Sequence, residues 1–155
     1  MSNVFSPVVS LVLLISCVFA NAGVASESTA VLVENGYARE SIPGTSISSA
    51  YMAISNLSAK NIKLVAASSS VSDRIEIHQH IMSDGLMRMR QRDYVDILAK
   101  NTVIFQPSGF HLMMFDLKQP LKAKEHIVIT LHFDDKSSID VNYTIKGLKR
   151  KKHHH

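Results

Sequence analysis

Apolar and polar residues alternate along most of the chain after residue 30. Such alternation puts successive side chains on opposite faces of a strand and is typical of half-buried β-strands. The stretches that fit period two better than the helical period are residues 31–40, 46–56, 62–70, 74–82, 86–92, 102–105, 111–117, 126–133 and 139–147. Turn sequences separate several of them, at residues 42–44, 83–85, 107–109 and 134–136. With no convincing helix, this pattern predicts an all-β antiparallel sandwich.

The N-terminus has the form of a secretory signal peptide. The apolar run from Pro7 to Ala20 is too short for a comfortable membrane span, and an A-x-A cleavage pattern follows it at residues 20–22. We predict a signal peptide at residues 1–22, a linker at 23–29, one domain at 30–147 and a basic tail at 148–155. The alternative is a lipoprotein signal in which Cys17 becomes the lipidated first residue. We favour simple cleavage because the residues after Cys17 are still apolar, and we expect a periplasmic protein.

Charge and composition exclude some functions. The chain has 155 residues, 46% of them hydrophobic, which is enough for the core of one domain. Its net charge of +4 comes from five basic residues that follow the last acid, and without them 12 basic residues face 13 acidic ones. A nearly neutral body with only a basic tail argues against nucleic-acid binding. We also expect no stable membrane span in the mature chain, and a monomer.

Residues 78–113 collect the soft, metal-capable side chains. This window holds three of the eight His and four of the seven Met. On strands, the His residues at 78 and 80 and Met82 share the face opposite Ile75, Ile77 and Ile81. The turn at residues 83–85 then brings a Met pair back beside this face. On a later strand, His111 and Met113 lie at i and i+2, so both can point at one ion. The candidates are His78, His80, Met82, Met87, Met89, His111 and Met113.

The softness of these donors indicates the metal. Thioether sulfur suits Cu(I) and imidazole suits copper or zinc, so two His with two Met favour Cu(I) over zinc. Four neutral ligands leave Cu(I) its single positive charge, which suits an ion that is handed on. A blue-copper site needs a thiolate, and the one cysteine, Cys17, lies in the predicted signal peptide. The chain also lacks H-E-x-x-H, G-x-S-x-G and a carboxylate cluster beside the His pairs, so we do not expect an enzyme.

Four motifs together resemble the PCu(A)C-type periplasmic copper chaperones. They are Glu76-Ile77-His78, the stretch DGLMRMR at 84–90, the stretch GFHLMM at 109–114 and the stretch LKQPL at 117–121. The family's ligand spacing is His, ten residues, Met, twenty-one residues, His-x-Met, and His78, Met89, His111 and Met113 meet it. The resemblance covers residues 30–147. It implies a cupredoxin-like Greek-key sandwich that binds one Cu(I) and supplies copper for cytochrome c oxidase. It also implies partners such as oxidase subunits or a thiol-containing assembly factor.

The remaining His and Met residues carry alternatives. Many members of the family have Met where this chain has His80, which leaves His80 as an auxiliary ligand or a rim residue. We interpret Met82, Met87 and Met114 as packing residues or neighbours of the ligands. Met52, His126 and His132 we interpret as structural or surface residues. The terminal His153, His154 and His155 form a weaker Cu(II) site or belong to a purification tag. The competing function is a secreted structural or adhesive β-sandwich with incidental His and Met.

Overall fold

The computed structural model describes residues 30–147, which form ten β-strands and no helix. The all-β prediction is therefore confirmed. No helix in this part of the chain is long and apolar enough to cross a membrane. The predicted signal peptide with Cys17, the linker and the tail with its three terminal histidines lie outside the described residues. The strands are β1 (Val31–Arg39), β2 (Ser48–Asn56), β3 (Ile62–Ser68), β4 (Ser72–Ser83), β5 (Leu86–Arg92), β6 (Val95–Ile97), β7 (Thr102–Phe105), β8 (Phe110–Leu117), β9 (His126–Phe133) and β10 (Ser138–Lys146).

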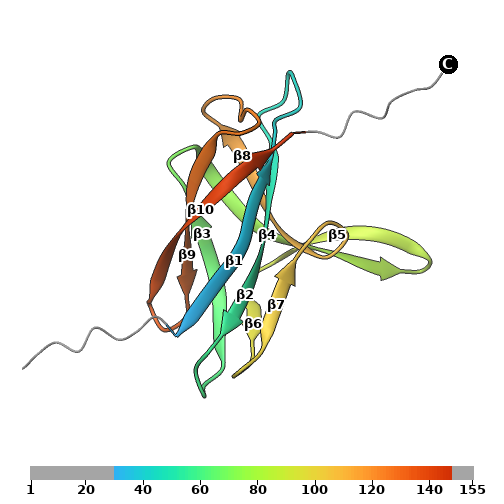
Figure 1. The fold of residues 1–155 in the computed structure, drawn as a ribbon. Coiled ribbons are helices and arrows are strands. Elements are labelled where there is room, and N and C mark those ends of the chain that lie inside the picture. Colours follow the sequence, from blue (N-terminus) through green and yellow to red (C-terminus); the bar gives the residue numbers. More distant parts are fainter. Residues whose placement is uncertain (1–29, 148–155) are drawn as a thin grey trace, which may run out of the picture.

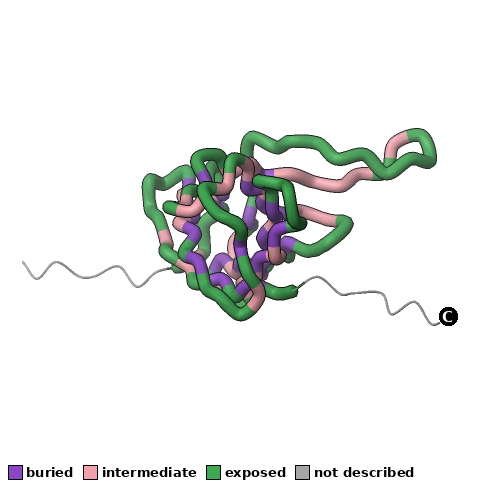
Figure 2. The backbone as a smooth tube through the Cα atoms, turned by 90° about the horizontal axis from the view of Figure 1, so that it is seen from above, coloured by how far each residue is buried: buried purple, intermediate pink, exposed green. Residues whose placement is uncertain are grey.

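The strands form one sheet in the order β5-β4-β8-β7-β2-β1-β10-β9-β3-β6, with an added pairing of β8 with β2. The view from above shows this sheet curled around an interior of buried residues (Figure 2). Most neighbours are antiparallel, as predicted, but β1 pairs with β10 and β7 with β8 in parallel. A hairpin can join only antiparallel neighbours, and the first and last strands are not joined by one. Their pairing direction was therefore not encoded in any turn.

The core lies on the inner face of the sheet. The alternation seen in the sequence assigns its members, since every second residue of β2 and β9 is buried, as are Leu112 and Met114 of β8. Residues with no exposed surface include Ile54, Leu64, Leu112, Met114 and Leu131. Met114 is thus a packing residue, as interpreted from the sequence. Met52 is buried as well, and its sulfur accepts a hydrogen bond from the hydroxyl of Tyr143.

One strand was not predicted from the sequence, and one predicted strand contains a bulge. The strand β6 was not predicted, because three residues are too few for alternation to be visible. The Asn35-Gly36 pair, usually a hairpin signal, lies inside β1 as a bulge between Glu34 and Tyr37. Asn35 adopts a φ of 56° there. The bulge therefore lies within one continuous strand, as the sequence predicted.

The outer half of β4 and the whole of β5 form a hairpin, here called the arm (residues 79–92), that projects from the body (Figures 1 and 2). All seven residues of β5 are exposed. The strand lies at the edge of the sheet and pairs only with β4. Its Asp84-Gly85 turn has φ values of 53° and 75°, the left-handed conformation of a two-residue hairpin loop.

The arm is predicted to be the least stable part of the described fold. A segment with few buried contacts opens at a free energy near zero, whereas core strands open only with global unfolding. In hydrogen–deuterium exchange, we expect the amides of β5 to exchange much faster than those of Met52 and Ile54 in β2. Equal protection of β5 and β2 would mean that the arm is covered or held in a way that its exposure does not reveal.

Candidate metal site

The strands β4, β5 and β8 present their His and Met residues on the outer face of the sheet, except for Met114, which lies in the core. Ile77 of β4 and Leu112 of β8 are buried in the core, so their neighbours along the strand point the other way. We call this outer surface the His/Met face. It is formed by His78, His80, Met82, Met87, Met89, His111 and Met113. The sequence predicted the shared face of the first three and the return of the two arm methionines beside it, but it placed the last two only together on a later strand.

Three imidazole rings lie together at the centre of this face. His78 of β4 is directly opposite His111 of β8, and their ring centroids are 5.9 Å apart. The ring of His80 stacks on that of His111 at 5.0 Å. His111 is only 3% exposed, although its strand face points away from the core. The face thus has a buried imidazole at its centre, with two more imidazoles packed beside it.

The register of the arm decides which histidine faces Met89. Met89 lies opposite His80, while Gln91 lies opposite His78. The ligand spacing of the similar family associates Met89 with His78. The sequence analysis therefore did not predict that Met89 lies opposite His80. A signal was present, because a two-residue loop at Asp84-Gly85 fixes the pairing of every residue up the hairpin. Met82 and Met87 form the next pair outward along the arm, farther from the imidazoles.

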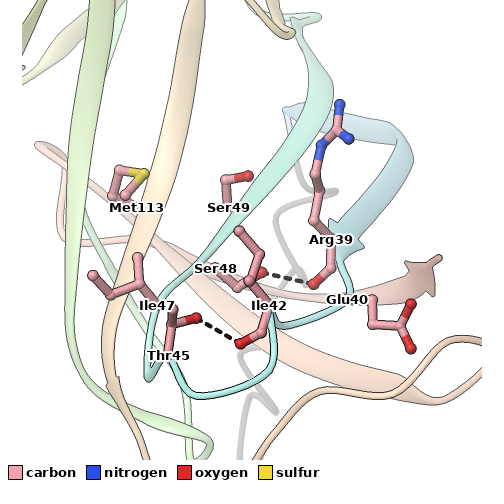
Figure 3. A pocket seen from close by; sticks show the side chains of 8 residues that line it. All are labelled: Arg39, Glu40, Ile42, Thr45, Ile47, Ser48, Ser49 and Met113. Atoms are coloured by element: carbon pink, nitrogen blue, oxygen red, sulfur yellow. Dashed lines mark hydrogen bonds between the residues drawn. The ribbon is translucent and has the colours of Figure 1, made fainter. Parts of the chain in front are cut away.

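Met113 lies on the other side of the histidines. Its partners in the sheet are Glu76 of β4 and Ser49 of β2. The residue also lines a groove of about 310 Å³ (Figure 3). The groove's lining residues are Arg39, Glu40, Ile42, Thr45, Ile47, Ser48, Ser49 and Met113. The surface of this groove is mainly apolar, and a molecule entering it would meet the side chain of Met113.

Hydrogen bonds orient two of the imidazoles. The Nε2 atom of His78 lies 2.8 Å from Oε2 of Glu76, and Arg74 donates to Oε1 of the same carboxylate at 2.6 Å. The bond from His78, more than that from Arg74, lowers the pKa of Glu76. Nδ1 of His111 lies 3.2 Å from the carbonyl oxygen of Gly109. Burial lowers the pKa of His111, so the neutral imidazole, which can bind a metal, is favoured.

Two ring nitrogens on this face are left without a partner. Nδ1 of His78 and Nδ1 of His80 are buried and make no hydrogen bond. Such orphaned atoms are rare in proteins and call for an explanation such as an ion. Among residues 30–147, no three or more His, Cys, Asp or Glu side chains are grouped to hold a metal by themselves. Thioether sulfurs, which Met89 and Met113 offer, are the further donors available on this face.

A family model matches most of the described chain. The model, "Putative lipoprotein LpqE-like", covers residues 31–145. This chain belongs to the LpqE-like family. The uncharacterized protein RP573 of Rickettsia prowazekii is 35% identical to this LpqE-like protein over 99 residues, which make up 63% of this chain and 55% of the relative. The chain thus spans only about half the length of that relative.

Solved structures with the same fold include PCuAC domains. The copper-bound PCuAC domain from PmoF2 matches this LpqE-like protein with a TM-score of 0.66 at 15% identity, over 77% of this chain and 94% of that domain. The solution structure of CuI-DR1885 from Deinococcus radiodurans matches with a TM-score of 0.63 at 28% identity, over 82% and 85% of the two chains. The predicted resemblance to the PCuAC type is confirmed, and with it the predicted fold class.

Truncation of two methionines of this LpqE-like protein should have very different effects on its stability. Met114 has no exposed surface, so Met114→Ala leaves a core cavity and should cost about 2–5 kcal/mol of unfolding free energy. Met89 is 46% exposed, and Met89→Ala should change stability by less than about 0.5 kcal/mol. Urea denaturation followed by circular dichroism measures both. A large loss of unfolding free energy for Met89→Ala would indicate that this side chain packs against the fold rather than serving as a metal ligand.

Proposed function

We propose that this LpqE-like protein binds one Cu(I) ion outside the cytoplasm and hands it to an acceptor protein. His78, Met89, His111 and Met113 are the proposed ligands. The observation that carries the proposal is the His/Met face, where three imidazoles lie between two thioether-bearing positions. The similar protein DR1885, whose structure was solved as CuI-DR1885, supports Cu(I) as the cargo.

The exposure of the donors suits release as well as binding. His111 is nearly inaccessible, whereas Met89 lies on the exposed arm and Met113 lines the groove. An acceptor with stronger donors therefore reaches the two thioethers before the imidazoles. Because all four ligands are neutral, they can be replaced one at a time without separating strong opposite charges. This favours handing the ion on over retaining it or cycling its redox state.

His80, Met82 and Met87 are proposed auxiliary donors of unequal standing. The ring of His80 lies beside that of His111 and opposite Met89, and its Nδ1 atom is unpartnered. This supports His80 as a fifth donor that takes over while another ligand is displaced. Met82 and Met87 pair one step farther out on the arm. They would bind the ion only transiently.

The setting of the proposed activity is extracytoplasmic. The description of the family as lipoproteins supports export, either with a cleaved signal peptide into a periplasm or with lipidation at Cys17. We propose that the acceptor is a cytochrome c oxidase subunit or a thiol-containing assembly factor, and that the protein acts as a monomer and is not an enzyme. A weaker Cu(II) site at His153, His154 and His155 is part of the same proposal.

The ligand assignment can be tested with a Cu(I) competition titration. Changing residues that merely support a metal ligand already costs about 10- to 100-fold in affinity, so removing two ligands should cost at least as much. We expect this loss for the double variant His111→Ala/Met113→Ala. X-ray absorption of the Cu(I)-loaded wild type should show two sulfur and two nitrogen neighbours, with a further nitrogen if His80 joins.

The control for this titration is His126→Ala, which removes an exposed imidazole from β9. It should bind Cu(I) like the wild type. A urea denaturation of the double variant separates lost ligands from lost folding, since His111 is buried. If the folded double variant bound Cu(I) with unchanged affinity, the chaperone proposal would be wrong. A structural or adhesive sandwich would then be the better interpretation.

The order of displacement can be tested by replacing one thioether with a thiolate. The variant Met113→Cys offers a charged, stronger donor for Cu(I), so transfer to a thiolate acceptor should slow down. Met113→Leu, which lacks a donor, is the matched control and should not slow transfer. Stopped-flow transfer to a small dithiol probe measures the rates. Equal rates for wild type and Met113→Cys would show that Met113 is not displaced early.

A further inference from the structure

A chain of charged side chains runs along the His/Met face to His78. Arg74 bonds to Glu76 at 2.6 Å and to Asp116 at 3.4 Å, and its guanidinium lies 4.1 Å from the ring centroid of Phe115. Glu76 in turn bonds to His78. The side chains of Glu76 and His78 are only 18% and 13% exposed. The carboxylate of Glu76 is therefore bonded to Arg74 on one oxygen and to His78 on the other, in a largely solvent-shielded position.

The contact fixes where the proton of His78 resides. A carboxylate oxygen only accepts, so Nε2 of His78 must carry the hydrogen that it donates to Glu76. A neutral imidazole has one N–H, and its other nitrogen then presents a lone pair. That nitrogen is Nδ1, which is buried and has no partner. The ring is thus set with a bare donor atom inside the face.

His111 has the opposite arrangement. The carbonyl oxygen of Gly109 can only accept, so Nδ1 of His111 carries the hydrogen and Nε2 is left with the lone pair. Neighbours that take one N–H of an imidazole commonly orient the other nitrogen toward a metal. The two histidines that face each other across β4 and β8 would therefore use different nitrogens.

We propose that Glu76 is a positioning residue that makes His78 bind its cargo through Nδ1, while His111 binds through Nε2. This inference rests on the proposed function, since it takes Cu(I) as the cargo. Arg74 contributes by occupying Oε1 of Glu76, as His78 occupies Oε2. With both oxygens engaged, the carboxylate does not become a ligand. The donor set stays soft and neutral, and a hard oxygen that would favour zinc is withheld.

The substitution Glu76→Gln should reverse the tautomer. Arg74 needs an acceptor, so the amide oxygen of the new side chain will turn to Arg74 and its NH₂ group to Nε2 of His78. Nε2 must then accept, and the hydrogen moves to Nδ1, the proposed donor atom. Ring ¹⁵N–¹H correlation spectra of the metal-free protein distinguish the two tautomers. Cu(I) affinity should fall by about 10- to 100-fold.

Asp73→Asn is the matched control for Glu76→Gln. It removes a carboxylate from the same strand, but Asp73 is exposed and pairs with Lys118 at 3.0 Å rather than with a histidine. Neither the tautomer of His78 nor the affinity for Cu(I) should change. A merely electrostatic role of Glu76 would instead weaken binding without moving the hydrogen, and that result would overturn the proposal.

The wild type alone also tests the inference, in case the variant does not fold. Cu(I) is diamagnetic, so the ring nitrogens can be followed as the ion is added. We expect the Nδ1 resonance of His78 to shift while its Nε2–H stays bonded to Glu76, and the Nε2 resonance of His111 to shift. A shift at Nε2 of His78 would overturn the role of Glu76. A wild type that binds no Cu(I) would overturn the proposed function, while the tautomers of the metal-free proteins would still decide the effect of Glu76 on the ring.

Discussion

The antiparallel pairing of β4 with β8 is the constraint on which the site depends. In this register Ile77 faces Leu112 on the core side, and His78 faces His111 on the outer side. Because side chains alternate along a strand, the burial of the apolar pair holds the imidazole pair in place. A slip of one residue would bury imidazoles and expose the core. The stability of the fold and the geometry of the site are thus consequences of one register.

The sequence was enough to place the metal-capable residues on the correct face. Alternation is a local property, and it holds for His78 and His111 because each is next to a residue that is buried in the core, Ile77 or Leu112. It could not show that His111 is covered by its neighbours to 3% exposure, since that burial comes from rings on other strands. The parallel pairing of β1 with β10 escaped prediction because no hairpin turn joins these two strands.

The approach of His80 to the centre of the face shows a different limit. Family spacing directs attention to His78 and Met89, but the hairpin register pairs Met89 with His80. The Asp84-Gly85 turn contains that information, so careful use of loop length would have found it. The role inferred for Glu76 was out of reach, because a Glu two residues before a His on a strand need not contact it. The contact is visible only in the side-chain geometry, where Glu76 bonds to His78 through one oxygen and to Arg74 through the other.

The projecting arm has a chemical consequence beyond binding. Met82, Met87 and Met89 are 68%, 56% and 46% exposed, whereas Met52 and Met114 are at most 2% exposed. Peroxides convert accessible thioethers to sulfoxides, which are polar and offer oxygen in place of a soft sulfur lone pair. Oxidative damage would therefore concentrate on the arm and spare the core. A molecule harmed in this way would stay folded while losing its soft donors, and a sulfoxide reductase could restore it.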